Sequence, residues 1–242
     1  MQIWIYSISS VLIVSLISLI GLLTLSIKEN LLKNILIYSI SFSAGALFGD
    51  VFIHLLPEII EKNGLTVQIS SFVLLGIVVS LFIEKIIHWR HCHIPVNKTH
   101  IHRFAYMNLF GDSIHNFIDG LIIGAAYLIS IPVGMATTMA VIFHEIPQEI
   151  GDFGVLLHAG ISRKKALIYN FLTATTSILG AIIAIFLSSK IEGATNMLSA
   201  FAAGSFIYIA GSDLIPELHK ETELKKSVMQ IFTFILGIAI MY

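Results

Sequence analysis

Eight long apolar stretches, separated by short polar segments, follow one another along the chain. Each is long enough to cross a bilayer as a helix, which takes about 20 mostly apolar residues. The apolar runs are continuous rather than alternating with a period of two, and this favours helices over the strands of a membrane barrel. The predicted spans lie near residues 3–27, 34–60, 66–89, 104–130, 133–159, 164–188, 194–218 and 224–242.

The composition agrees with this pattern. Of the 242 residues, 56% are hydrophobic and only 12% are charged, and the mean hydropathy is +0.90. A soluble domain carries about 25% charged residues, so we expect an all-α integral membrane protein surrounded by a lipid bilayer. The net charge of −1 argues against nucleic acid as a partner.

The basic residues predict how the chain is oriented. The segments after the even-numbered spans hold only Lys62 and Lys190, whereas the loops after the odd-numbered spans are rich in lysine and arginine. Basic residues gather on the cytoplasmic side, so both termini are expected to be extracytoplasmic. The first span lacks a preceding basic segment and is too long for a secretory signal. A bacterial cytoplasmic (inner) membrane is the expected location.

Two segments of the chain share a motif. "FSAGALFGDVFIHLLPE" (42–58) and "FAAGSFIYIAGSDLIPE" (201–217) align without gaps, and they occupy spans expected to cross the bilayer in opposite directions. This predicts the inverted repeat that many secondary transporters use, although chance convergence of small helix-packing residues stays open. The implied arrangement is a single transmembrane domain, 1–242, with a 3+2+3 order: helices 1–3 over 3–89, a central pair over 104–159 and helices 6–8 over 164–242.

The fourth and fifth spans carry polar residues along one face each. At 3.6 residues per turn, the polar positions of each span fall on one stripe or beside it. The two spans are joined by a short connection and must pack antiparallel, so the stripes are expected to meet within the membrane. The residues are Asn108, Asp112, His115, Asn116 and Asp119 in the fourth span, and His144, Glu145, Gln148, Glu149 and Asp152 in the fifth.

A divalent cation explains why these groups meet in a hydrophobic setting. Carboxylates facing one another at low dielectric repel or become protonated unless a cation compensates them. A mixture of imidazole and carboxylate suits zinc or a neighbouring first-row metal, and Asp119 and Glu145 could bridge two ions. Pro147 removes a backbone donor, which frees the carbonyl of Phe143 and bends the helix. The alternative is a hydrogen-bonded cluster that only fixes helix packing.

"HEIPQE" (144–149) also invites comparison with zinc proteases. Their His-Glu-x-x-His helix uses both histidines as metal ligands. Here the second position is Gln148 and Pro147 interrupts the turn, so a protease is not expected.

"HNFIDG" (115–120) together with "HEIPQEIGDF" (144–153) resembles the ZIP family of divalent-metal transporters, and in particular its LIV-1-like branch. "GDVFIHLLPE" (49–58) and "NFLTATTSILGA" (170–181) extend the resemblance over nearly the whole chain. The resemblance implies eight helices in the three–two–three order and metal uptake into the cytosol. It also implies two adjacent metal sites between helices 4 and 5, and an elevator-like movement of one helix group against another.

Carried over residue by residue, the family pattern supplies the metal ligands. A histidine is usual where this chain has Gln148, and an amide oxygen is a harder and weaker ligand than imidazole. Some branches have a glutamate where this chain has Ser177, so the second metal position is expected to be less well coordinated. The ligands implied are His115, Asn116, Asp119, His144, Glu145 and Gln148, with Glu149 as a further candidate.

Other polar residues are candidates for the metal's route or for contacts that support the ligands. Asp50 and His54 lie one turn apart in the first repeat, and His54 corresponds to Asp213 in the second. The alternative is that they are polar helix ends near the prolines of the repeat. The full set of candidates for the route comprises Asp50, His54, Asp112, Asp152, Ser177 and Asp213.

The loop over residues 90–103 and its flanks are rich in histidine. Nitrogen and sulfur ligands in a flexible cytoplasmic loop can receive or sense zinc, although a solvated basic loop explains the composition equally well. The candidate ligands are His88, His91, His93, His100 and His102, next to Cys92.

Together these features predict a transporter, not an enzyme, that carries divalent transition metals, with Zn²⁺ first and Fe²⁺, Mn²⁺ or Cd²⁺ open. One alternative is an intramembrane metal-dependent hydrolase, which needs an activated water and a separate base. Another is a metal sensor led by the histidine loop. A homodimer is compatible with the pattern.

Overall fold

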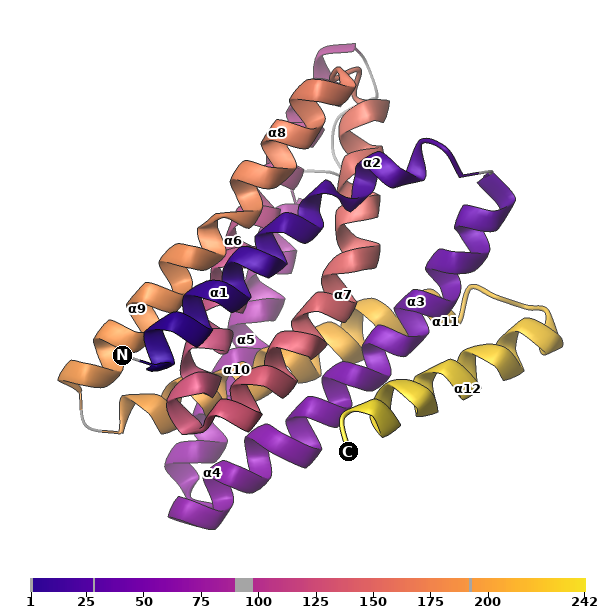
Figure 1. The fold of residues 1–242 in the computed structure, drawn as a ribbon. Helices are drawn as coiled ribbons and strands as arrows, with labels where there is room; N and C mark the ends of the chain where they lie inside the picture. Colours follow the sequence, from indigo (N-terminus) through magenta and orange to yellow (C-terminus); the bar gives the residue numbers. More distant parts are fainter. Residues whose placement is uncertain (1, 28, 90–97, 192) are drawn as a thin grey trace.

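The computed structural model describes residues 2–27, 29–89, 98–191 and 193–242, and within these ranges the chain is helical without strands. Each predicted span corresponds to one helix or to consecutive helical pieces (Figure 1). The all-α expectation is therefore confirmed. The elements are α1 (Gln2–Ile17), η1 (Ser18–Ile20), α2 (Gly21–Thr24), α3 (Glu29–Gly49), η2 (Asp50–Leu55), α4 (Leu56–Asn63), α5 (Val67–Trp89), α6 (Lys98–Ile129), α7 (Ile131–His158), α8 (Arg163–Ala174), α9 (Thr176–Lys190), α10 (Ala194–Tyr208), η3 (Ile209–Leu214), α11 (Ile215–Leu218) and α12 (Leu224–Ile240).

Five of the described helical stretches are long and apolar enough to cross a membrane. They are Gln2–Thr24, Asn34–Asn63, Val67–Ile86, Arg163–Lys190 and Ala194–Leu218. Helices α6 and α7 are long but carry the polar stripes, and α12 has 17 residues. Large apolar side chains such as Phe82 and Phe232 are 63% and 59% exposed, as expected of helices that face lipid rather than water.

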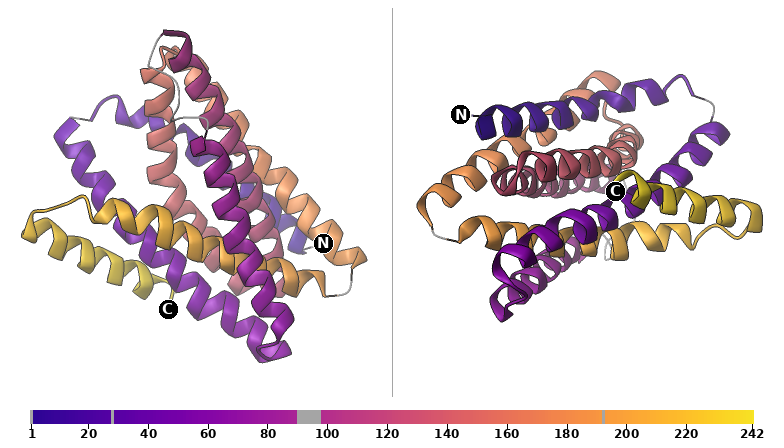
Figure 2. Two further views of the ribbon diagram at one scale, coloured as in Figure 1. Left: turned by 180° about the vertical axis from the view of Figure 1, so that it is seen from behind. Right: turned by 60° about the horizontal axis from the view of Figure 1, so that its bottom comes forward.

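The helices form two groups. In the first, α6 packs along α9 and α7, and α1 lies against all three; in the second, α3 packs along α12, and α10 along α5. Figure 1 shows α1 with α8 and α9 on one flank and α3 with α12 on another, and Figure 2 shows the groups from behind and from below. The two groups meet where α3 packs against α7 and α10 against α6. The 3+2+3 grouping stays a prediction.

Reciprocal glycine contacts hold the second group together. A Cβ atom on Gly45 of α3 would lie 2.0 Å from the carbonyl oxygen of Phe234 of α12, and one on Gly237 would lie 2.1 Å from that of Phe42. The same contact recurs between α10 and α5, where a Cβ on Gly204 would lie 1.9 Å from the carbonyl oxygen of Val73. Gly45 and Gly204 occupy equivalent positions of the repeat, and only glycine allows backbones to come this close.

The repeat also shows in an irregularity of the backbone. Both copies contain a π-helical segment at the same position, Asp50–Leu55 in one and Ile209–Leu214 in the other. Each is followed by a proline, Pro57 or Pro216, near the start of the next helix. Proline cannot donate a backbone hydrogen bond, and π turns accommodate such a local mismatch. The two copies therefore share a backbone shape as well as a sequence motif.

The apolar core lies at the junction of the two groups. Buried side chains from α1, α3, α6, α7 and α10 meet there, among them Leu47, Ile122, Val141 and Phe206. The ring of Phe206 meets the ring of His144 edge-on, with centroids 5.9 Å apart, so this core covers one end of the polar stripes.

Candidate metal centre

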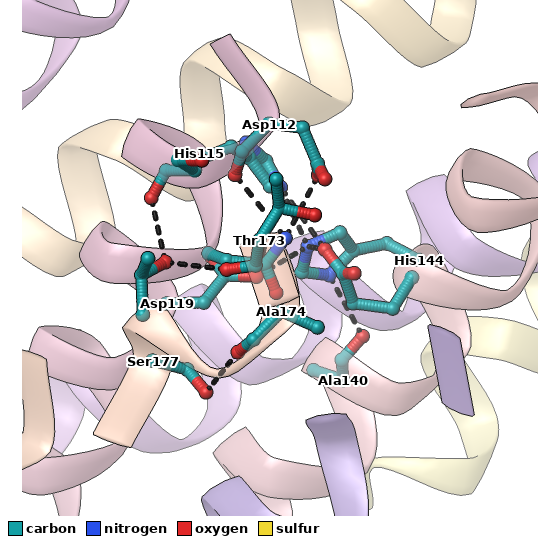
Figure 3. Close-up of polar contacts among 12 residues, drawn as sticks. Asp112, His115, Asp119, Ala140, His144, Thr173, Ala174 and Ser177 are labelled. Atoms are coloured by element: carbon teal, nitrogen blue, oxygen red, sulfur yellow. Dashed lines mark hydrogen bonds and ion pairs between the residues drawn. The ribbon is translucent and has the colours of Figure 1, made fainter. Parts of the chain in front are cut away.

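Two histidines and two carboxylates converge between α6 and α7. The connection between these helices is a single residue, Ser130, whose side chain accepts a hydrogen bond from the backbone of α7. His115 and Asp119 lie one turn apart on α6 and face His144 and Glu145 of α7. One ligand atom from each of the four residues lies within 4.8 Å of the others. Figure 3 shows His115, Asp119 and His144 pointing toward one another.

The spacing of these atoms fits a tetrahedral metal site. The Nε2 atom of His144 lies 3.0 Å from Oδ2 of Asp119, 3.2 Å from Nε2 of His115 and 3.5 Å from Oε1 of Glu145. Nε2 of His115 lies 3.3 Å from Oε1 of Glu145 and 3.6 Å from Oδ2 of Asp119. Four ligands that hold zinc at about 2.0–2.2 Å stand about 3.3–3.6 Å apart at the corners of a tetrahedron. These five distances are close to those values, and all four atoms lie within 4.8 Å of one another.

The hydrogen bonds around the cluster leave its acceptors facing inward. Nδ1 of His144 lies 3.1 Å from the carbonyl oxygen of Ala140, which can only accept, so this nitrogen carries the proton. In the neutral ring the lone pair is then on Nε2, directed at the other ligands. Both carboxylate oxygens of Glu145, and Oδ1 of Asp119, are buried without a hydrogen-bond partner among the described residues. A cluster so rich in buried acceptors needs a positive charge, and a metal cation supplies one.

Three of the seven predicted ligands lie beside this cluster rather than in it. Asn116 donates its amide hydrogens to Asp112 on its own helix, at 2.8 Å, and its Oδ1 is buried without a hydrogen-bond partner in the described part of the chain. Glu149 accepts a hydrogen bond from Asn170 of α8 at 3.0 Å. Gln148 faces an adjacent cavity. Their role as ligands stays a prediction.

Ser177 faces away from the cluster. Its hydroxyl donates to the carbonyl oxygen of Ala174 at 2.7 Å and lies 3.2 Å from the hydroxyl oxygen of Ser15 on α1. Figure 3 shows this direction. The side chain is buried and engaged in helix packing. The weaker second metal position, and a place for Ser177 on the metal's route, stay predictions.

An acidic cavity of about 240 Å³ opens beside His115. It extends along α6 and α7 and is closed on the far side by α5, α10 and η3. Among the described residues, its lining includes carboxylates but no lysine or arginine, so their charge favours cations. The carboxylates that line it are Glu84, Asp112, Asp152 and Asp213, and the neutral polar residues are Ser80, Asn108, Gln148 and Tyr208.

Hydrogen bonds order the walls of this cavity. Asn108 of α6 donates to Asp152 of α7 at 2.8 Å, and the Tyr208 hydroxyl of α10 donates to Glu84 of α5. Of the residues predicted to line the metal's route, Asp112, Asp152 and Asp213 are found here. Glu84 and Tyr208 were missed, although a lone glutamate inside the apolar 66–89 stretch was a signal that could have been used.

Asp50 and His54 lie away from this cavity. Asp50 is fully buried on η2 and accepts a hydrogen bond from Thr137 of α7 at 3.2 Å, while its other oxygen has no hydrogen-bond partner in the described ranges. His54 is half-buried in the same π-helical segment. A place on the metal's route stays a prediction for both.

The predicted histidine cluster of the loop cannot be placed. His91, Cys92 and His93 lie outside the described residues, and the side chains of His88, His100 and His102 lie outside them as well.

Comparisons with known proteins identify relatives of the chain. The family model described as ZIP Zinc transporter matches residues 1–103 and 92–242. Zinc transporter zipt-7.2 of Caenorhabditis elegans is 28% identical across 100% of this chain, which spans 65% of that protein's length. The Zinc transporter ZIP13 homolog of Drosophila melanogaster is 30% identical over 98% of this chain and 88% of its own length. Zinc transporter ZIP10 of Danio rerio is 41% identical over 57% of this chain and 17% of its own length.

A match over both halves of the chain, together with a relative that is 30% identical over nearly its whole length, shows the family. The chain belongs to the ZIP zinc transporter family, a family of membrane transporters rather than enzymes.

Proposed function

We propose that the chain moves Zn²⁺ through the membrane into the cytosol, and that His115, Asp119, His144 and Glu145 hold the ion on its way. The observation that carries this proposal is the set of four ligand atoms between two helices, at distances close to those of a tetrahedral zinc site, with three of the four residues buried. The zinc transporters named above add support, since they are similar over much or all of the chain.

Zinc is the first choice because of the donor set. Two imidazole nitrogens and two carboxylate oxygens in a tetrahedron match its preferred coordination. Fe²⁺, Mn²⁺ and Cd²⁺ remain further candidates, since affinity in such sites depends on availability as well as on ligand type. Gln148 lines the neighbouring cavity and offers a weak oxygen ligand that would ease release.

A second, adjacent ion would share the carboxylates of this centre. Glu145 and Asp119 each keep a buried oxygen without a hydrogen-bond partner among the described residues, and so does Asn116. These oxygens are hard ligands, so the second position would hold its ion less tightly than the histidine-containing one.

The acidic cavity indicates the side of the membrane from which the centre is reached. It runs from His115 toward Asn108 on α6 and from Gln148 toward Asp152 on α7. These segments lead to the helix ends that the basic residues assign to the cytosol. At the opposite side of the centre lies the apolar core with Phe206 and Val141, which would block water and ions. With both termini extracytoplasmic, this arrangement corresponds to access from the cytosol alone.

Transport then requires the metal centre to become accessible from the other side of the membrane. All four ligands of the centre belong to the α6–α7 pair, whereas α3, α5, α10 and α12 form the second group. One group could carry the ion past the other as a rigid body, which is the elevator-like form of alternating access. A homodimer and the identity of the membrane remain predictions from the sequence.

Zinc flux into proteoliposomes tests the proposal. Wild-type protein should take up zinc, and His144→Ala should abolish uptake while the protein stays in the membrane. His158→Ala is a matched control, because this histidine ends the same helix but is exposed. Normal uptake by His144→Ala would contradict the site, and no uptake of any divalent metal by the wild type would contradict the function.

A further inference from the structure

The peptide group just before the first ligand of α7 lacks its helical hydrogen bond. Pro147 stands four residues after Phe143 and has no N–H to donate, and its ring crowds the carbonyl oxygen of Phe143. A serine from another helix supplies the missing hydrogen-bond donor. The Oγ atom of Ser43, on α3, lies 2.5 Å from the carbonyl oxygen of Phe143 and donates to it.

The contact is partly buried and specific. Ser43 has no exposed surface, and the ring of its neighbour Phe42 meets the ring of Phe143 edge-on with centroids 4.8 Å apart. The hydroxyl of Ser43 also lies 2.7 Å from the carbonyl oxygen of Ser39 on its own helix. A hydroxyl has one hydrogen to donate, so it can serve either Phe143 or Ser39 but not both at once.

The internal repeat provides a comparison within the chain. Ala202 of α10 stands at the position equivalent to Ser43, and alanine cannot donate. Helix α10 packs against α6 as α3 packs against α7, and α6 contains no proline. The hydroxyl therefore occurs only in the copy that faces a proline-interrupted helix. The residue before it is phenylalanine in both copies, Phe42 and Phe201.

We propose that Ser43 is a positioning residue for metal binding, which rests on the function proposed above. Its hydrogen bond fixes the peptide group joining Phe143 to His144, and thereby sets His144 and Glu145 against the ligands of α6. The atoms of the centre are only 3.0–3.6 Å apart, so a small shift of this turn changes the tetrahedron. Because α3 belongs to the other helix group, the bond also ties the ligand geometry to the arrangement of the groups. When α7 moves, Ser39 can accept the hydrogen instead.

Binding of Co²⁺ to purified protein in detergent tests this proposal. Tetrahedral Co²⁺ absorbs visible light much more strongly than octahedral Co²⁺, so one titration reports affinity and geometry. Ser43→Ala should weaken affinity about tenfold, the scale seen when groups that orient metal ligands are changed, and should reduce the tetrahedral band. Ser43→Thr keeps the hydroxyl and should bind like the wild type.

Ser41→Ala is the matched control. Ser41 lies on the same helix, is buried, and donates to the carbonyl oxygen of Gln230 on α12 at 2.5 Å. This variant loses a bond of the same kind within one helix group and should keep wild-type affinity and spectrum. Equal behaviour of Ser43→Ala and Ser41→Ala would overturn the proposal.

A double-mutant cycle gives a second test that does not depend on how well Ser43→Ala folds alone. Pro147→Ala restores an N–H that can serve Phe143, so Ser43→Ala should cost little or no further affinity in that background. A similar loss in both backgrounds would mean that Ser43 acts only through packing, and would overturn the proposal. Failure of the wild-type protein to bind any divalent metal would instead contradict the proposed function.

Discussion

His144 is the residue on which the most contacts of the centre converge. It is 1% exposed, its Nδ1 is engaged by the carbonyl of Ala140, and its Nε2 lies close to three other ligand atoms. The contact with Ala140 orients the ring so that Nε2 is directed at the other ligand atoms, which lowers the entropy lost on binding.

Asp119→Asn should remove most of the metal affinity while keeping the shape of the side chain. The carboxylate is fully buried and its Oδ2 lies 3.0 Å from Nε2 of His144. The neutral amide oxygen of asparagine is a weaker metal ligand than a carboxylate oxygen. We therefore expect the zinc affinity to fall about a hundredfold or more. Calorimetric titration with zinc measures this change.

Asp50→Asn is the control for that titration. Asp50 is equally buried, but it contacts Thr137 rather than the cluster. Its variant should bind zinc with wild-type affinity. Equal affinity losses in the two variants would mean that charge in the membrane, rather than direct ligation, governs binding.

At the scale of elements, the periodicity of α6 and α7 is what made the centre predictable. His115 and Asp119 are four residues apart, and His144 and Glu145 border the facing stripe, so helical geometry alone brings them to one place. The positions of Asn116, Gln148 and Glu149 were not predictable this way. Each lies near the same stripe, and whether it turns to the centre, to the cavity or to α8 depends on the helix packed against it.

Contacts between residues of different helices were the hardest to predict from the sequence. Pro147 indicates that the carbonyl of Phe143 needs a donor, but nothing in the local pattern indicates that Ser43, 100 residues earlier, supplies it. The same holds for Glu84 and Tyr208, whose contact joins α5 to α10. Such partners follow from tertiary packing, which composition and periodicity do not encode.

The close approach of α3 to α12 predicts a strong effect of a small substitution. Gly45→Ala places a Cβ atom 2.0 Å from a backbone oxygen of α12, so the two helices must separate, and overpacking of this kind costs about 1–3 kcal/mol or more. The protein should unfold at a lower temperature in detergent.

Gly154→Ala, on α7, provides the comparison for that experiment. Nothing lies within 4 Å of the position that its Cβ would take. The change should be neutral or stabilising by up to about 1 kcal/mol, because alanine favours a helix more than glycine does. An unchanged unfolding temperature for Gly45→Ala would show that the helices are not held as closely as described.

At the scale of the whole molecule, the junction between the two helix groups decides whether the ion can change sides. The Ser43 hydroxyl and the Phe42–Phe143 ring contact join α3 to α7 there, and a hydrogen bond from Thr137 of α7 to Asp50 joins η2 to α7. If transport moves one group past the other, this junction must slide.

A covalent bridge across the junction should therefore stop transport. With Cys92 replaced by serine, cysteines at Phe42 and Phe143 should lose zinc flux on oxidation and regain it on reduction. Cysteines at Ser15 and Ser177, whose oxygens lie 3.2 Å apart within the first group, should keep their flux when bridged. Undiminished flux with the Phe42–Phe143 bridge formed would exclude sliding at this junction.

The reciprocal glycine contacts bear on the ancestry of the molecule. Helix α3 packs on α12, and α10 packs on α5. In the predicted 3+2+3 grouping, the middle helix of each three-helix half therefore packs on the last helix of the other half. A three-helix half on its own therefore lacks the helices against which its glycines pack. If the chain arose by duplication of a three-helix gene, the ancestral product had to find those partners on a second copy, inserted in the opposite orientation. Under that history, fusion of the genes would have freed each half to diverge, for example at Ser43 and Ala202.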